Sequence, residues 1–195
     1  MGLKGIKTTA DYIDWDIAIS LIRKLYRDKD YIMSLFIGCG IFTGLRVSDL
    51  RQLTWEMILS NDKFEITEQK TGKHRIIKLN DEFRNHILKC KEVLNITNLS
   101  ARCFLSRMGT VLTTQIINRR LKEIKKKYNL KVENLSCHSL RKTFGRKIFE
   151  SSGENAQLAL VKLSELFNHS SISITKVYLG LKQEEILSAY DLLDF

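Results

Sequence analysis

The chain of 195 residues contains no proline, although about one residue in twenty is usual in globular proteins. No Pro-rich linker therefore divides the chain, and its helices must end at Gly, Asn, Ser or Asp. The sequence also lacks a run of 18 apolar residues and a signal-peptide pattern at its start, so we expect no membrane partner. No internal repeat is present, and the length suffices for one domain with a sizeable core.

The four cysteines form no Cys-x-x-Cys pair and show no spacing with histidine that is typical of metal ligands. Cys39 lies in the apolar run YIMSLFIGCGIF, which indicates buried packing. We therefore expect free thiols, no metal site and a reducing, cytoplasmic compartment.

Positive charge is in excess, with 32 Lys and Arg residues against 22 Asp and Glu residues and a net charge of +10. Residues 111–150 hold eleven basic and three acidic side chains, a net charge of +8. Such a block favours a polyanionic partner, because each neutralised phosphate releases counterions. A solvated, lysine-rich helix would show the same charge, so composition alone leaves both interpretations open.

Apolar periodicity predicts a mostly helical α+β fold. Asp14 is a candidate N-cap for a helix over 14–27, and residues 30–43 are apolar nearly all round, which predicts a central buried helix that ends at Gly44. Another helix is expected to start in VSDLRQLTW. Later helices are predicted at 81–94, 113–128, 138–151, 154–167, 172–179 and 182–193.

The pattern between residues 57 and 79 changes to that of a sheet. KFEITEQ alternates with period two, KTGK is a turn, and HRIIKL resumes an extended run. We expect a small antiparallel sheet of about three strands, with MILS at 57–60 as the third.

Two stretches in the first half could carry chemistry. In TGLRVSDL, Arg46 stands at a helix start, where backbone N–H groups favour anions. In EQKTGK, Lys70 lies beside a tight turn that can present its ammonium into a groove. Each stretch also has an ordinary interpretation, namely a surface Arg46 paired with Asp49 and a solvated lysine.

Two further stretches lie in the second half. In CHSLRKTFGRK, His138 and Arg141 are three residues apart and share one face of a helix. In LFNHSSISITKVYLG, Tyr178 follows His169 by nine residues. The ordinary interpretation is that Tyr178 packs in a core and that Ser170 or Ser171 caps a helix.

Together these residue types suit phosphodiester transesterification without a metal. Two guanidiniums can clamp the non-bridging oxygens, on which charge grows in the transition state. A tyrosine hydroxyl has a pKa of about 10, so it needs a base or cationic surroundings, and the departing 5′-oxygen needs a proton that a lysine can donate. The sequence DWD at 14–16 is more readily a helix start than a metal site, and no Gly-rich phosphate loop suggests a nucleotide, so we expect no cofactor.

The order of these four stretches along the chain resembles that in the catalytic domain of the tyrosine recombinases, the phage integrase family. The resemblance runs from about residue 12 to about residue 190. The resemblance makes Asp49 the acidic residue that supports the first catalytic arginine. It implies the catalytic set Arg46, Lys70, His138, Arg141, His169 and Tyr178. The family commonly has Gly and Asp where this chain has Asn168 and Ser139, and we interpret both differences as local packing changes.

The resemblance implies site-specific DNA recombination or integration through a 3′-phosphotyrosyl intermediate, by the integrase of a phage or other mobile element acting in the bacterial cytoplasm or nucleoid. Tyr178 would be the nucleophile, Arg46 and Arg141 would hold the phosphate, and His169 would donate a further hydrogen bond. His138 would accept or relay the tyrosine proton, and Lys70 would protonate the leaving oxygen. The alternatives are strand relaxation like that of a type IB topoisomerase and a non-catalytic DNA-binding module.

We expect one catalytic domain over 1–195, with 1–12 as an extension or linker and 181–195 as a tail helix. Only 45 residues precede Arg46, too few for the amino-terminal core-binding domain of the family, so an excised domain is preferred over a minimal recombinase. In the family, the segment after the nucleophile often docks on a neighbouring protomer. We therefore expect other protomers as partners on double-stranded DNA, and a monomer without DNA.

The expected DNA-backbone contacts are Lys73, Arg75, Arg119, Arg120, Lys122, Lys126, Lys127, Lys142, Arg146 and Lys147. Backbone contacts carry no sequence information, so replacing Lys126 and Lys127 by alanine should weaken binding to all duplexes alike and lower the salt slope. Fluorescence anisotropy on two unrelated duplexes over a salt series measures both quantities. A loss confined to one duplex would contradict the prediction.

Overall fold

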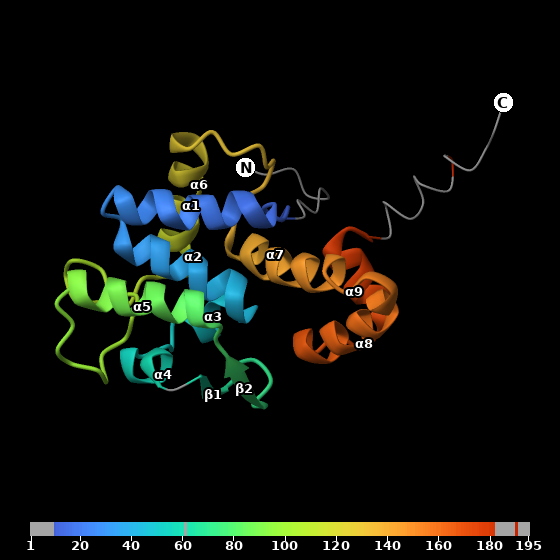
Figure 1. Ribbon diagram of the computed structural model, residues 1–195, viewed down its shortest axis with the longest axis horizontal. Coiled ribbons are helices and arrows are strands. Elements are labelled where there is room, and N and C mark those ends of the chain that lie inside the picture. The colour runs from blue at the N-terminus through green and yellow to red at the C-terminus, as the bar shows by residue number, and fades with distance from the viewer. Residues whose placement is uncertain (1–9, 61, 182–189, 191–195) are drawn as a thin grey trace. The chain divides into compact units, whose positions relative to one another are not determined.

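The computed structural model describes residues 10–60, 62–181 and 190 (Figure 1). The chain divides into two compact units, Met1–Phe144 and Gly145–Phe195. Unit 1 contains α1 (Trp15–Arg27), α2 (Tyr31–Thr43), α3 (Val47–Leu50), α4 (Trp55–Leu59), β1 (Lys63–Thr67), β2 (His74–Lys78), α5 (Asp81–Val93), α6 (Thr114–Lys127) and the first half of α7 (Cys137–Glu150). Unit 2 contains the rest of α7, a 3-10 turn (Gly153–Asn155), α8 (Ala156–Phe167) and α9 (Ile172–Leu179).

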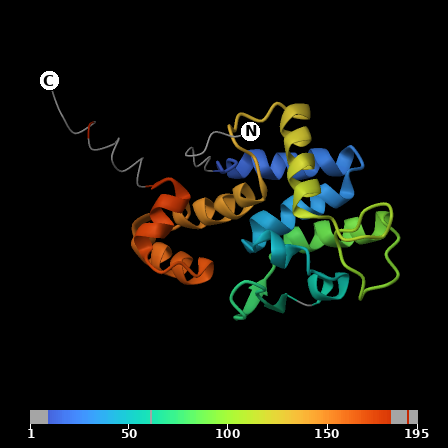
Figure 2. The same ribbon diagram turned by 180° about the vertical axis from the view of Figure 1, so that it is seen from behind.

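The helix α2 is the centre of unit 1. Ten of its residues are buried, and α1 packs along it, as both ribbon views show (Figures 1 and 2). A Cβ atom at Gly38 would lie 2.3 Å from the Phe83 ring of α5, and one at Gly40 would lie 2.7 Å from Leu140 of α7. The two glycines therefore let α5 and α7 approach the α2 backbone closely.

The helix starts and stops read from the sequence are confirmed in unit 1. Asp14 accepts hydrogen bonds from the backbone of Asp16 and Ile17 at 3.0 and 3.2 Å, and Gly44 ends α2 with a φ of 60°. The helices expected around 81–94, 113–128, 138–151, 154–167 and 172–179 are also present. The helix expected at 182–193 falls almost wholly outside the described residues.

The prediction of a third strand at 57–60 is wrong. Residues 57–59 belong to α4, because Thr54 caps that helix by accepting from the Met57 N–H at 3.2 Å and because Trp55 and Ile58 bury one helical face. Within the described residues the sheet has two antiparallel strands, β1 and β2, in which Phe64 pairs with Ile77. The helix expected from VSDLRQLTW is likewise divided into α3 and α4.

All four cysteines are buried free thiols, as expected. Burial raises the pKa of both Cys90 and Cys137 to about 12, so these side chains pack as small apolar groups. Among the described residues, no helix has the length and apolar character needed to cross a membrane.

His86 of α5 is a neutral histidine inside unit 1. The Ser34 hydroxyl donates to the Ile22 carbonyl at 2.8 Å, so its oxygen can accept from His86 Nε2 at 3.0 Å. Burial, with a smaller effect of the Lys89 charge, lowers the pKa of His86 to about 4. Folding therefore favours the neutral ring. The contribution of His86 to the free energy of unfolding is fully present above the pKa of its ring in the unfolded chain, about 6.5, and is lost as the pH falls towards 4.

We expect the free energy of unfolding of unit 1 to fall by about 2–3 kcal/mol more in the wild type than in His86→Gln between pH 7 and pH 4.5. The glutamine keeps a hydrogen-bond donor near Ser34 but does not titrate. Urea unfolding followed by tryptophan fluorescence measures this difference, because Trp15 and Trp55 both lie in unit 1. Equal acid sensitivity of the two proteins would show that His86 does not contribute.

Candidate active site

The two predicted catalytic arginines, Arg46 and Arg141, lie in one cluster of unit 1. Arg46 occupies the N-cap position of α3, and its Nη1 lies 2.6 Å from Glu68 Oε2. Arg141 of α7 donates through Nη1 to the Gly44 carbonyl at 2.5 Å, two residues before Arg46. The charges of both arginines lower the pKa of the Glu68 carboxyl, so the fold places side chains that are 95 residues apart in the sequence near the same carboxylate.

Glu68 is the acidic centre of this arginine cluster. Its side chain is 4% exposed, and Oε2 accepts from both Arg46 Nη1 and Thr71 Oγ1, at 2.6 and 2.9 Å. Burial alone would raise the pKa of Glu68. The hydrogen bonds from Thr71 and Arg46 and the charges of Arg46 and Arg141 outweigh it, so the pKa lies below its ordinary value. The carboxylate is therefore ionised at neutral pH.

Glu68 was not among the residues predicted from the sequence, although the sequence pattern contains a signal for it. Phe64, Ile66 and Glu68 are alternate residues of the period-two pattern and all three are buried. A carboxylate in the core-facing register of a strand needs charged partners, because an unpaired buried charge is costly. That pattern marks Glu68 as part of an ion-pair cluster.

Arg75, expected to contact the DNA backbone, has its partners inside unit 1. Its side chain is 11% exposed, Nη2 donates to the Thr43 carbonyl at 2.7 Å, and Nη1 lies 3.6 Å from Glu68 Oε1. Burial lowers the pKa of Arg75, and the charge of Glu68 opposes this effect. The guanidinium thus joins the strand β2 to the end of α2 instead of standing open on the surface.

Lys70 lies exposed in the turn between β1 and β2. The fully buried Asp49 of α3 accepts from the backbone N–H of Gln69 at 2.9 Å, so α3 holds the chain next to Lys70. Asp49 was predicted to support the first catalytic arginine. In the structure it links the helix that starts at Arg46 to the hairpin that carries Lys70.

His138 stands in the first turn of α7, and this turn explains one difference from the family pattern. Ser139 accepts from the Ser136 N–H at 3.0 Å, and Ser136 accepts from the His138 N–H at 3.3 Å, as in a reciprocal helix cap. Ser139 therefore fixes the start of the helix. Desolvation and then the positive charges of Arg141 and Lys142 lower the pKa of His138, which keeps the ring neutral and able to accept a proton.

In unit 2, Asn168 explains the second difference from the family pattern. It ends α8 in the left-handed region, with φ 53° and ψ 49°, and the His169 N–H then donates to the Ser164 carbonyl at 2.9 Å. Asparagine is among the few residues other than glycine that adopt this backbone at low cost, so it suits a position where the family commonly has glycine.

His169 and Tyr178 lie together in unit 2. Their ring centroids are 5.3 Å apart with the rings edge to face, and the Phe167 ring lies 5.5 Å from His169 and 5.4 Å from Tyr178. His169 Nδ1 is 2.9 Å from the hydroxyl oxygen of the buried Thr175, which orients the imidazole. Ser171 caps α9 by accepting from the Ile174 N–H, which confirms the interpretation that Ser170 or Ser171 caps a helix in this segment.

Several of the predicted DNA-contacting residues are engaged in ion pairs. Arg120 and Lys127 of α6 each lie 2.6 Å from an aspartate of the α1–α2 connection, Asp30 and Asp28 respectively. Weaker or local pairs join Arg119 to Glu123 at 3.8 Å and Arg146 to Glu150 at 2.9 Å. The pairs of Arg120 and Lys127 attach α6 to the α1–α2 connection, and together with the Arg119–Glu123 pair they reduce the charge that α6 offers to a phosphate.

The remaining predicted contacts differ in exposure. Lys73 is exposed in the hairpin turn, and Lys122 and Lys126 are exposed on α6. Lys142 is buried, which lowers its pKa, while Asp11 opposes that shift. Lys147 is partly buried on α7. The contacts of all ten basic residues with DNA stay predictions.

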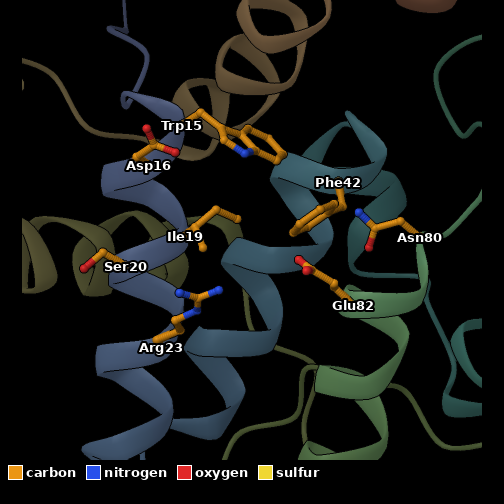
Figure 3. Close-up of a pocket in the computed structure, with 8 residues that line it drawn as sticks. All are labelled: Trp15, Asp16, Ile19, Ser20, Arg23, Phe42, Asn80 and Glu82. Carbon is orange, nitrogen blue, oxygen red and sulfur yellow. The ribbon is translucent and has the colours of Figure 1, made fainter. Parts of the chain in front are cut away.

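A pocket of about 370 Å³ lies between α1, α2 and the start of α5 (Figure 3). Its apolar wall includes Trp15 and Phe42, whose ring centroids are 5.2 Å apart, and its polar lining includes Arg23 and Glu82. None of the predicted catalytic side chains lines this pocket. The described residues also contain no group of three or more His, Cys, Asp or Glu side chains placed to hold a metal ion.

Comparison with known proteins identifies the family. Residues 21–185 match the model of the phage integrase family. The chain is 30% identical over 168 residues to the probable integrase/recombinase YoeC of Bacillus subtilis (strain 168), with 83% of each chain covered. It is 27% identical over 170 residues to the tyrosine recombinase XerD of Staphylococcus saprophyticus, covering 85% of this chain and 54% of that relative. The chain belongs to the phage integrase family.

Solved structures show the same fold. The crystal structure of XerA recombinase superposes with a TM-score of 0.72 at 20% identity, over 97% of this chain and 68% of that one. The structure of XerH recombinase bound to a palindromic difH substrate superposes with a TM-score of 0.68 at 18% identity, over 98% of this chain and 58% of that one. The mostly helical fold with a small antiparallel sheet is thus confirmed as that of a tyrosine recombinase catalytic domain. These relatives are named as a probable integrase/recombinase and as recombinases, and membership of the family supports site-specific DNA recombination by a DNA strand transferase.

We expect Asp49→Ala to lower the free energy of unfolding of unit 1 by about 1–3 kcal/mol, because the Gln69 N–H would lose its buried acceptor. Faster hydrogen exchange of the Gln69 amide would locate the effect in the hairpin. Ser48→Ala is the matched control, since it removes a 3.3 Å donor to Asp49 and leaves the Gln69 bond in place. Similar losses in the two variants would contradict the role of Asp49.

Proposed function

We propose that this protein carries out site-specific recombination of duplex DNA by transesterification, as the integrase of a mobile element. The observation that supports this most is the arginine cluster of unit 1, in which Arg46 and Arg141 share the neighbourhood of Glu68. Unit 2 supplies Tyr178 beside His169. The order of these residues along the chain is that of the family pattern.

In the proposed reaction, the Tyr178 hydroxyl oxygen attacks a backbone phosphorus and the bond from that phosphorus to the 5′-oxygen breaks. His138 takes the tyrosine proton, and Lys70 gives a proton to the departing 5′-oxygen. Arg46, Arg141 and His169 hold the non-bridging oxygens, on which negative charge grows.

The product of this step is a 3′-phosphotyrosyl link and a free 5′-hydroxyl. Attack by a 5′-hydroxyl of another strand reverses the step and restores the tyrosine. The phosphodiester energy stays in the covalent link, so the proposed cycle consumes no nucleotide. Exchange between two duplexes needs other protomers, which we propose as partners when the protein is bound to DNA. We propose that the protein is a monomer when no DNA is bound.

Two other functions remain as competing proposals. Strand relaxation like that of a type IB topoisomerase would use the same residues but rejoin the original strand. A non-catalytic DNA-binding module would keep the basic surface without the covalent step. The six residues of the catalytic pattern are all present, burial and nearby positive charges lower the pKa of His138, and Arg46 is held by a partly buried ion pair with Glu68. These observations favour the enzyme.

The test is incubation with a pool of nicked suicide duplexes that cover the flanks of the element encoding the protein. A covalent protein–DNA adduct that survives denaturation is expected for the wild type and should be lost in Tyr178→Phe. Tyr190→Phe, at an exposed tyrosine, is the matched control and should form the adduct at the wild-type rate.

Equal DNA retention by the wild type and Tyr178→Phe without any adduct would support the binding module instead. Relaxation of supercoiled plasmid without a specific site would support the topoisomerase. Sequencing of the adducts identifies the DNA site, which connects the protein to its element.

A further inference from the structure

We propose that Glu68 is a positioning residue of the recombination reaction, which sets the orientation of Arg46 for binding the scissile phosphate. This inference rests on the proposed function for its reaction, but its structural content is the contact network of unit 1. Glu68 itself would not touch the DNA.

The network connects three segments through one carboxylate. Oε2 of Glu68 lies 2.6 Å from Arg46 Nη1 and 2.9 Å from the Thr71 hydroxyl, and Oε1 lies 3.6 Å from Arg75 Nη1. Arg75 is in turn anchored to the Thr43 carbonyl at 2.7 Å. The end of α2, the start of α3 and the hairpin turn next to Lys70 thus meet at Glu68.

The geometry suits control of a guanidinium. Arg46 is 19% exposed and Glu68 is 4% exposed at their side chains, so the ion pair joins a solvent-accessible donor to a fixed, buried acceptor. A guanidinium is planar, and one short hydrogen bond at Nη1 restricts the direction in which the rest of its donors point. The ion pair therefore restricts the Arg46 side chain before phosphate binds, so less of its conformational entropy is lost on binding.

The same network reaches Lys70. Thr71 follows Lys70 directly, and its hydroxyl donates to the oxygen that also accepts from Arg46. One carboxylate oxygen therefore sets the relative placement of a phosphate-holding arginine and of the turn with the proposed proton donor. A shift of about 1 Å in such groups can cost about a hundredfold in rate.

Two other roles for Glu68 make different predictions. If the Glu68 carboxylate competed with the phosphate for Arg46, removing the charge of Glu68 would raise both the phosphate affinity and the rate of the covalent step. If the ion pair served stability alone, rates measured well below the unfolding temperature would not change. A positioning role predicts a slower covalent step with little change in duplex affinity.

The kinetic test uses single-turnover formation of the Tyr178 adduct on the nicked duplex identified above. Glu68→Gln keeps the length of the side chain and removes its charge, whereas Glu68→Asp keeps the charge and shortens the reach. We expect both variants to react about 10–100-fold more slowly, with duplex affinity by anisotropy within about threefold of wild type. Glu65→Gln, on the exposed face of the same strand, is the matched control and should react at the wild-type rate.

A second measurement needs no DNA site and separates this inference from the proposed function. Titration of the wild type with inorganic phosphate, followed by NMR of ¹⁵N-labelled arginine side chains, should shift the Arg46 Nε signal, which Arg46→Lys assigns. Glu68→Gln should need several-fold more phosphate for the same shift, and Glu65→Gln should not. Thermal unfolding of each variant confirms that the folded protein is being compared.

Each outcome bears on one of the two proposals. Weaker phosphate binding in Glu68→Gln, without an adduct on any duplex in the wild type, supports the part of the inference that Glu68 orients Arg46 for phosphate binding and defeats the proposed recombination. Adduct formation at the wild-type rate in Glu68→Gln, or tighter phosphate binding, overturns the positioning role and leaves the recombination standing. An Arg46 signal that does not respond to phosphate in the wild type also overturns it.

Discussion

The contact between Glu68 and Arg46 is the interaction on which the arrangement of the candidate site in unit 1 depends. A carboxylate inside a protein is stable only with partners, and Glu68 finds them in Thr71, Arg46 and Arg75. Because these partners come from the hairpin and from the start of α3, satisfying one buried charge also fixes segments that are separate in sequence. The small sheet thereby serves as the support of a cationic site.

The charge balance around Glu68 explains why the cluster suits an anion. Three guanidiniums, those of Arg46, Arg75 and Arg141, influence or contact one carboxylate. The buried Asp49, whose charge acts on Arg75, is a second carboxylate of this cluster, so three guanidiniums exceed two carboxylates by one positive charge. Electrostatic attraction to a phosphodiester is stronger in such a partly desolvated setting than in bulk water. Burial first, and then the positive charges of Arg141 and Lys142, lower the pKa of His138, which fits the proton-accepting role proposed for it.

Local rules predicted most elements of the fold from the sequence, because the caps at Asp14 and Ser171 and the stop at Gly44 act within a few residues. The prediction of a third strand at 57–60 was wrong because of tertiary packing. Burial of Trp55 and Ile58 in the core favours a helix for residues whose local sequence also fits a strand. The candidate catalytic residues came from an ordered set of short motifs and the family resemblance that they carry, and their roles stay predictions. Glu68 and the inward direction of Arg75 did not come from such motifs, because they depend on long-range charge pairing, which has no local periodicity.

The turn at Asn168 has a thermodynamic consequence beyond its shape. A glycine at this position would bring a wide range of backbone conformations to the unfolded chain, and all of them would be lost on folding. Asparagine enters the same left-handed turn, with φ 53°, from a more restricted unfolded ensemble. The direction in which His169 leaves α8 is therefore set at a smaller loss of backbone conformational entropy.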